Sequence, residues 1–162
     1  MMKNRGFTLI ETLVYLALFS LIIGGLVISA YGLFESSDRN QTKAMLQEES
    51  NFVMAKIVWA ISQAQAICDP AANMSGATLS VAVFGGTCFP PDITIALSES
   101  NVQWGIAALN NSNTSVDRLL FIHTYAGGTN PDSVEVGLTI SAKTPTGMTI
   151  TQSASTTRYI RK

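Results

Sequence analysis

Four side chains in this 162-residue sequence have chemistry that could form a site: the carboxylate of Glu11, the thiols of Cys68 and Cys88, and the imidazole of His123. Glu11 is the least expected, because it lies inside the otherwise apolar run of residues 7–34. A lone carboxylate inside a membrane costs about 2.5–3.5 kcal/mol on insertion scales. The chemistry open to it there is an ion pair with a cation buried in the same low-dielectric surroundings.

The two cysteines favour a disulfide rather than a metal site. Two thiols and one imidazole without helpful spacing do not complete a tetrahedral zinc site. If the chain is exported, a bridge between Cys68 and Cys88 is the better interpretation, and two unrelated buried thiols are the alternative. For a loop of about twenty residues the chain-entropy model gives such a bridge about 3 kcal/mol.

His123 does not suggest an enzyme. It lies in the alternating run RLLFIHTY, with no nucleophile or orienting carboxylate indicated beside it, so a partly buried strand histidine is favoured. The sequence contains no G-x-S-x-G, H-E-x-x-H or P-loop motif. Trp59 and Trp104 are predicted to be core residues rather than ligand platforms. We therefore expect no catalysis, no cofactor and no metal.

Composition limits the possible partners. Charged residues make up 13% of the chain and the net charge is −1, which gives no electrostatic case for nucleic-acid binding. The length suits one domain of ordinary size.

The N-terminal run must position Glu11, and it is long enough to span a membrane. No charged residue occurs from 12 to 34, more than the roughly 20 residues that a membrane helix needs. The run is too long for the apolar core of a secretory signal peptide. An ordinary signal anchor fits the length and the cationic flank of Lys3 and Arg5. It explains neither Glu11 nor Gly6 at the start of the run.

The segment KNRGFTLIE resembles the N-terminus of the type IV pilin and pseudopilin superfamily. In that family a short basic leader ends in Gly, a prepilin peptidase cuts after it, and the new N-terminal residue is methylated. The resemblance implies cleavage between Gly6 and Phe7, N-methylation of Phe7, and an assembly role for Glu11. The positive N-terminus of an incoming subunit could then pair with Glu11 of a neighbour. A simple helix-dipole role for Glu11 is the alternative.

The elements beyond this run predict an α+β fold, with a long N-terminal helix packed on a C-terminal antiparallel β-sheet. Residues 1–6 form the leader, 7–34 the transmembrane and filament-core helix, 35–67 its amphipathic continuation, and 68–162 a β-rich domain. A helix from 8 to 67 is roughly 90 Å long. Its buried stripe has helical spacing and ends before Asp69-Pro70. The stripe comprises Leu46, Val53, Ile57, Ala60, Ala64 and Ile67. The predicted strands are 78–84, 92–98, 102–107, 118–125, 133–142 and one within 148–160.

The strand pattern SVEVGLTISAK and the terminal TTRYIRK resemble the larger minor pseudopilins of type II secretion and minor pilins. Only Asp132 and Glu135 lie in the loop where a major pseudopilin binds calcium, too few for such a site. The resemblance implies a minor subunit of a type IV pilus or a secretion-like filament. Its partners are other subunits, the prepilin peptidase/methylase and an inner-membrane assembly platform.

The implied location is the cytoplasmic (inner) membrane as a single-pass protein, with the β-domain outside the cytoplasm, and then an extracellular or periplasmic filament. Within the family, a DNA-uptake pseudopilin or a major fibre subunit is the alternative. Outside it, a monomeric membrane-anchored adhesin or binding domain remains open.

Overall fold

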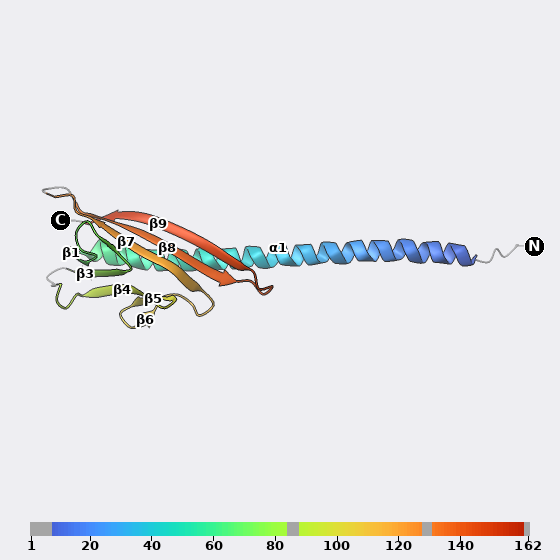
Figure 1. The fold of residues 1–162 in the computed structure, drawn as a ribbon, viewed down its shortest axis with the longest axis horizontal. Coiled ribbons are helices and arrows are strands. Elements are labelled where there is room, and N and C mark those ends of the chain that lie inside the picture. The colour runs from blue at the N-terminus through green and yellow to red at the C-terminus, as the bar shows by residue number, and fades with distance from the viewer. Residues whose placement is uncertain (1–7, 84–87, 128–130, 161–162) are drawn as a thin grey trace, which may run out of the picture. The chain divides into compact units, whose positions relative to one another are not determined.

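The computed structural model describes residues 8–83, 88–127 and 131–160, and the chain divides into two compact units, Met1–Arg39 and Asn40–Lys162. One helix, α1 (Leu9–Gln63), belongs to both units (Figure 1). It begins with backbone bonds from Glu11 and Thr12 to the Thr8 carbonyl, at 3.1 and 3.2 Å. The predicted α+β class, a long N-terminal helix followed by antiparallel strands, is confirmed.

The helix ends at Gln63, so the predicted end at Ile67 is wrong. Ile67 belongs instead to the strand β1 (Ala66–Asp69), where it pairs with Val81. The Gln65 amide also donates to the Ala82 carbonyl at 2.9 Å. Pairing with a neighbouring strand has therefore overridden the helical spacing of this segment, as tertiary contacts often do.

The β-rich part forms two antiparallel sheets, where the sequence predicted one. The five-stranded sheet has the order β1-β3-β4-β5-β6, with β3 (Thr78–Ala82), β4 (Ile93–Ser98), β5 (Asn101–Trp104) and β6 (Ala107–Ala108). The four-stranded sheet has the order β2-β7-β8-β9, with β2 (Ser75–Gly76), β7 (Ser115–Thr124), β8 (Ser133–Lys143) and β9 (Thr149–Tyr159). The predicted strand 102–107 is split by a turn at Gly105, whose φ is 61°. Phe84, the predicted end of the first strand, lies outside the described residues.

The core of the second unit lies between α1 and the sheets, which run alongside the last turns of the helix (Figure 1). The predicted helix stripe is buried as far as Ala64. Alternate side chains of β8 close the core from the opposite side, as strand periodicity requires. The fully buried members from α1 and β8 are Leu46, Val53, Ile57, Ala60, Ile61, Val134, Val136, Leu138 and Ile140.

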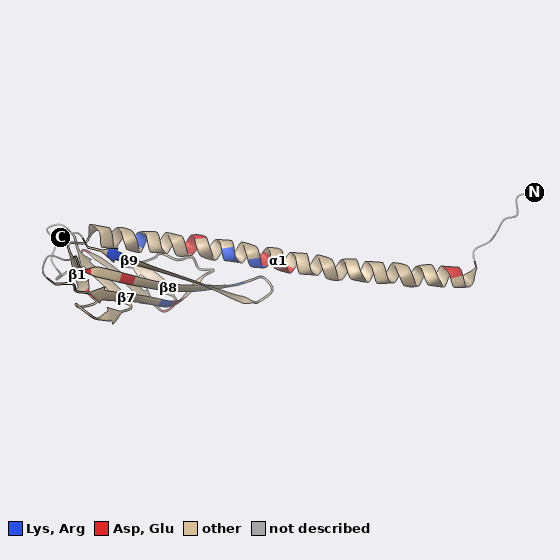
Figure 2. Cartoon of the chain, turned by 90° about the horizontal axis from the view of Figure 1, so that it is seen from above, with Lys and Arg blue, Asp and Glu red and all other residues tan. Residues whose placement is uncertain are grey.

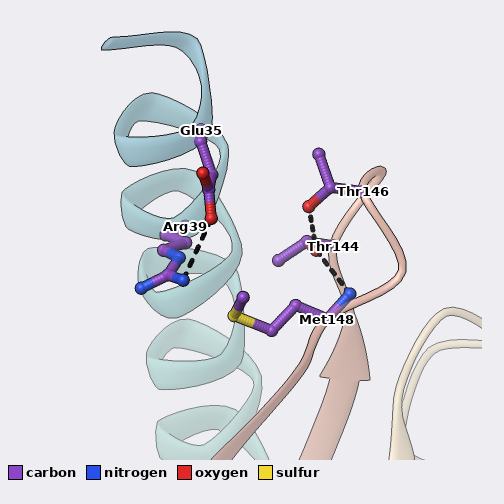
Figure 3. Close-up of polar contacts among 5 residues, drawn as sticks. All are labelled: Glu35, Arg39, Thr144, Thr146 and Met148. Carbon is purple, nitrogen blue, oxygen red and sulfur yellow. Dashed lines mark hydrogen bonds and ion pairs between the residues drawn. The ribbon is translucent and has the colours of Figure 1, made fainter. Parts of the chain in front are cut away.

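Figure 3 shows two local contacts, one within α1 and one in the turn between β8 and β9. On α1, Arg39 donates to Glu35 at 3.0 Å, one helical turn apart, where charged residues resume after the apolar run. Between β8 and β9, the Met148 amide donates to the Thr144 hydroxyl at 3.0 Å, and that hydroxyl lies 2.9 Å from the Thr146 hydroxyl. These bonds hold the tight turn that leads into β9.

Candidate functional site

Glu11, the predicted assembly contact, lies at the start of α1. It lies in the first helical turn, and its side chain is exposed. A negative charge there interacts favourably with the positive end of the helix dipole. Within the described residues, no cation or hydrogen-bond donor contacts its carboxylate. Gly6 and Phe7 lie outside the described residues, so cleavage between them and methylation of Phe7 remain predictions.

The apolar residues that follow Glu11 are exposed around the whole helix. None of α1 is buried before Thr42, and large side chains such as Leu21 and Leu33 are each 73% exposed. Figure 2 shows one acidic position near the start of α1 and then a long stretch without charge. The helix is long and apolar enough to cross a membrane. A helix that is apolar all round requires lipid or other helices around it in place of water.

The glycines of this segment do not serve packing within the chain. A Cβ atom added at Gly24, Gly25 or Gly32 would meet no atom within 4 Å. Glycine lowers helix stability in water by about 1 kcal/mol relative to alanine. In membranes, small residues let helices approach one another closely. These positions are therefore open to a neighbouring helix.

The disulfide predicted from the sequence is present. Cys68 and Cys88 are joined with a Cα–Cα distance of 5.4 Å, within the normal range. Cys68 lies in β1, directly after the helix, and Cys88 lies in the segment that leads to β4. The bridge therefore fastens the helix end and the sheet edge to the loop between β3 and β4.

His123 is buried rather than partly buried as predicted, with 5% of its surface exposed on β7. Its Nδ1 lies 2.9 Å from the Pro70 carbonyl oxygen. Because that oxygen can only accept, Nδ1 carries the hydrogen. Nε2 is buried without a hydrogen-bond partner among the described residues. The ring thus fastens the segment after β1 to the four-stranded sheet, a structural task.

The two tryptophans meet, but Trp59 is not the core residue that was predicted. Its side chain is 51% exposed, and Trp104 of β5 is partly buried. Their ring centroids are 5.7 Å apart with an interplanar angle of 40°. The contact packs the helix onto the five-stranded sheet, while about half of the Trp59 side chain stays exposed.

The loop expected to be poor in calcium ligands is organised by hydrogen bonds. Asp132 accepts a bond from the Ala126 amide at 3.3 Å, and its own carbonyl accepts one from the Ile160 amide at 2.9 Å. Glu135 faces outward on β8, opposite Ile122. In the described part of the chain, no group of three or more His, Cys, Asp or Glu residues could hold a metal ion.

Comparison with known proteins adds one finding. The family model of the prokaryotic N-terminal methylation motif matches residues 1–27. No curated protein and no solved structure matches the chain. The motif confirms the resemblance inferred from the leader and Glu11, and it supports a type IV pilin-like or pseudopilin precursor. It implies subunit assembly and processing by prepilin peptidase, and with the apolar helix it fits a membrane-anchored precursor.

Proposed function

From the prepilin-type motif that this chain carries, we propose that it is a minor pilin or pseudopilin subunit of a type IV pilus or a type II secretion-like filament. The observation that carries the proposal is the unburied apolar half of α1, which begins at the motif and continues as the core helix of a folded β-domain. Such a helix can sit in lipid before assembly and among other helices afterwards. The chain acts by polymerising, and it has no catalysis of its own.

Processing creates the contact that gives Glu11 its role. Cleavage between Gly6 and Phe7 exposes an α-ammonium group on Phe7, which is then methylated and stays positively charged. In the filament this cation pairs with Glu11 of a neighbouring subunit, so that two charges in low dielectric compensate each other. The open carboxylate of Glu11 supports this role. The pairing also fixes the register between subunits.

The charges of the leader and the disulfide support an orientation of the membrane helix in which the β-domain lies outside the cytoplasm. Lys3 and Arg5 stay on the cytoplasmic side under the positive-inside rule. The bridge between Cys68 and Cys88 is of the kind that forms and persists in oxidising compartments, which supports a β-domain outside the cytoplasm. The partners are other subunits, the prepilin peptidase/methylase and an inner-membrane assembly platform. A minor rather than a major role is supported by the scarcity of carboxylates around Asp132 and Glu135.

The deciding experiment is mass spectrometry of the mature N-terminus, with the chain coexpressed with a prepilin peptidase. We expect the mature chain to begin with N-methylated Phe7. The matched control is Gly6→Leu, which leaves the apolar helix unchanged and should remain uncut. An intact leader in the native chain would reject the prepilin assignment in favour of a plain anchor. A cut inside the apolar run, for example after the small residue Ala30, would reject it in favour of a secretory signal peptide.

A second experiment separates a filament subunit from a monomeric anchored binding domain. Sheared surface or periplasmic filaments from a strain that expresses the processed chain should contain it at low copy number. If the processed chain is found only in membranes, with filaments present and free of it, the anchored binding domain is the correct assignment.

A further inference from the structure

The outer edge of β9 is the longest open sheet edge in the described part of the chain. β9 has 11 residues and forms one edge of the four-stranded sheet (Figure 1). It pairs with β8 in one continuous register, from Thr149 opposite Lys143 to Tyr159 opposite Ser133. Within the described residues, no backbone group outside β8 bonds to β9. Alternate backbone groups of β9 therefore point away from the sheet, and no strand of the described residues pairs with them. The Ser153 carbonyl accepts a long bond, at 3.5 Å, from the side-chain amide of Gln152 on the same strand.

The other three sheet edges are blunted. β2 and β6 contain two residues each, too few to template a strand. β1 contains four residues, is interrupted by a bulge between Ile67 and Asp69, and carries Cys68 of the disulfide. Short strands and bulges are the usual means by which proteins prevent sheets from pairing edge to edge. β9 has neither.

β9 also lacks the protective side chains of an isolated edge. Its sequence, TITQSASTTRY, contains no Pro and no Lys, and Arg158 is its one charged residue. On its inner face, Ile150 and Ala154 pack against the core but stay partly exposed, whereas Leu138 and Ile140 of β8 are fully buried. A further strand beside β9 would cover these two side chains and would satisfy the open backbone groups.

We propose that β9 pairs antiparallel with β9 of a second copy of this chain, in the register that sets Ala154 opposite Ala154. No other edge described in this chain is long enough to match β9. This register pairs all eleven residues of both strands. It sets inner-face residues opposite inner-face residues, so the cores of the two copies lie on the same side of the joined sheet.

The side chains of β9 are complementary to themselves in this register. Thr151 lies opposite Thr157 and Ser153 opposite Ser155, and hydroxyl pairs of this kind are favourable across antiparallel strands. The two copies of Arg158 lie at opposite ends of the pairing, so like charges do not meet. The contact joins two four-stranded sheets into one, and it uses neither Glu11 nor the apolar helix. It therefore stands apart from assembly through α1.

The test uses Ala154→Cys in the full-length chain, purified in detergent and exposed to a mild oxidant. Residues opposite each other in an antiparallel pair have Cα atoms about 4.5–5.5 Å apart, within the range of a disulfide. Both native cysteines are already bridged, so the introduced thiol is the one free thiol. We expect a covalent dimer on a non-reducing gel, about tenfold more abundant than for the control.

The matched control is Thr149→Cys, an exposed position on the same strand. In the proposed register its two copies lie about 33 Å apart, at about 3.3 Å per residue, and they should not crosslink. A mixture of Thr149→Cys and Tyr159→Cys chains should crosslink, because these positions face each other. If Ala154→Cys fails to keep the native disulfide, this mixture decides the question.

Three results would overturn the proposal. The first is an Ala154→Cys chain that stays monomeric although alkylation shows its thiol to be accessible. The second is Thr149→Cys crosslinking to itself as readily as Ala154→Cys, which indicates random collision. The third is exclusive crosslinking of Ala154→Cys to a different protein in membranes, which shows that the open edge binds another partner. Processing and filament incorporation are read separately, so none of these results tests the proposed function.

Discussion

The two halves of α1 are made from similar apolar side chains but have opposite surroundings. Between Asn40 and Gln63, one stripe is buried against the sheets, and Leu46 and Ile57 have no exposed surface. Between Leu9 and Phe34, side chains project into open space on every side, and Ile22 is 62% exposed. The second half finds its apolar partner within the chain. The first half must find it in lipid or in other molecules.

This difference separates folding from assembly on a single helix. A stripe of about three or four positions per two turns is enough for a helix that packs against the sheets on one side only. A helix that is apolar on all sides can be surrounded completely only by a membrane or a bundle. Mutations in the two halves should therefore damage different properties of the protein, which the following substitutions test.

The largest effect is expected from Ile57→Ala, which opens a cavity between α1 and the sheets. Leu or Ile to Ala changes at buried positions cost about 2–5 kcal/mol of unfolding free energy. The matched control is Ile22→Ala, which removes the same atoms from the exposed half and should leave that free energy unchanged. Denaturant unfolding of the β-domain in detergent, followed by tryptophan fluorescence, measures both. Equal losses would contradict the division of the helix into two functions.

The next effect is expected from removing the bridge with Cys68→Ser and Cys88→Ser together. The loss should be about 3 kcal/mol for a loop near twenty residues in the chain-entropy model. It should lower the unfolding free energy of the β-domain only, because both cysteines belong to the second unit. Unfolding of the native chain with and without reductant provides an independent measurement. A loss of helix in the apolar half as well would show that the two halves are coupled.

Local sequence predicted the N-terminal motif well, because its information is concentrated in adjacent residues. Gly6, Phe7 and Glu11 belong to one short motif, which the family model also recognises. The apolar run and the helix stripe follow from composition and from spacing. The disulfide was predicted because the chain has two cysteines and an N-terminal apolar run that is typical of exported proteins. None of these inferences needed knowledge of distant contacts.

The predictions that failed depended on contacts that spacing cannot reveal. Ile67 fits the helix stripe, yet its backbone pairs with Val81, which lies on a different element. The short strands β2 and β6 exist only as partners of β7 and β5, so their two residues carry no pattern of their own. Trp59 was also expected in the core. It contacts Trp104, but half of its side chain remains exposed.

A smaller effect, confined to assembly, is expected from Glu11→Gln. The substitution keeps the size of the side chain and removes the charge that we propose pairs with the methylated N-terminus of a neighbouring subunit. We expect unchanged membrane insertion and processing, and about a tenfold fall in the fraction of subunit found in filaments, equivalent to about 1.4 kcal/mol. Quantitative immunoblotting of sheared filaments against membranes measures this fraction. Unchanged incorporation would reject the charge-pairing role and favour the helix-dipole alternative.

The smallest effect is expected from Glu35→Gln, which removes an acidic residue from the same helix where the apolar run has ended. Glu35 pairs with Arg39 at 3.0 Å, but both side chains are nearly half exposed, at 48% and 44%. Exposed pairs at this spacing contribute about 0.3–0.5 kcal/mol, and salt screens them further. Unfolding at low and high salt should show a difference of that size or less, and incorporation into filaments should not change. If Glu35→Gln reduced incorporation as much as Glu11→Gln, assembly would depend on the net charge of the helix, and the position of Glu11 beside the processed N-terminus would lose its significance.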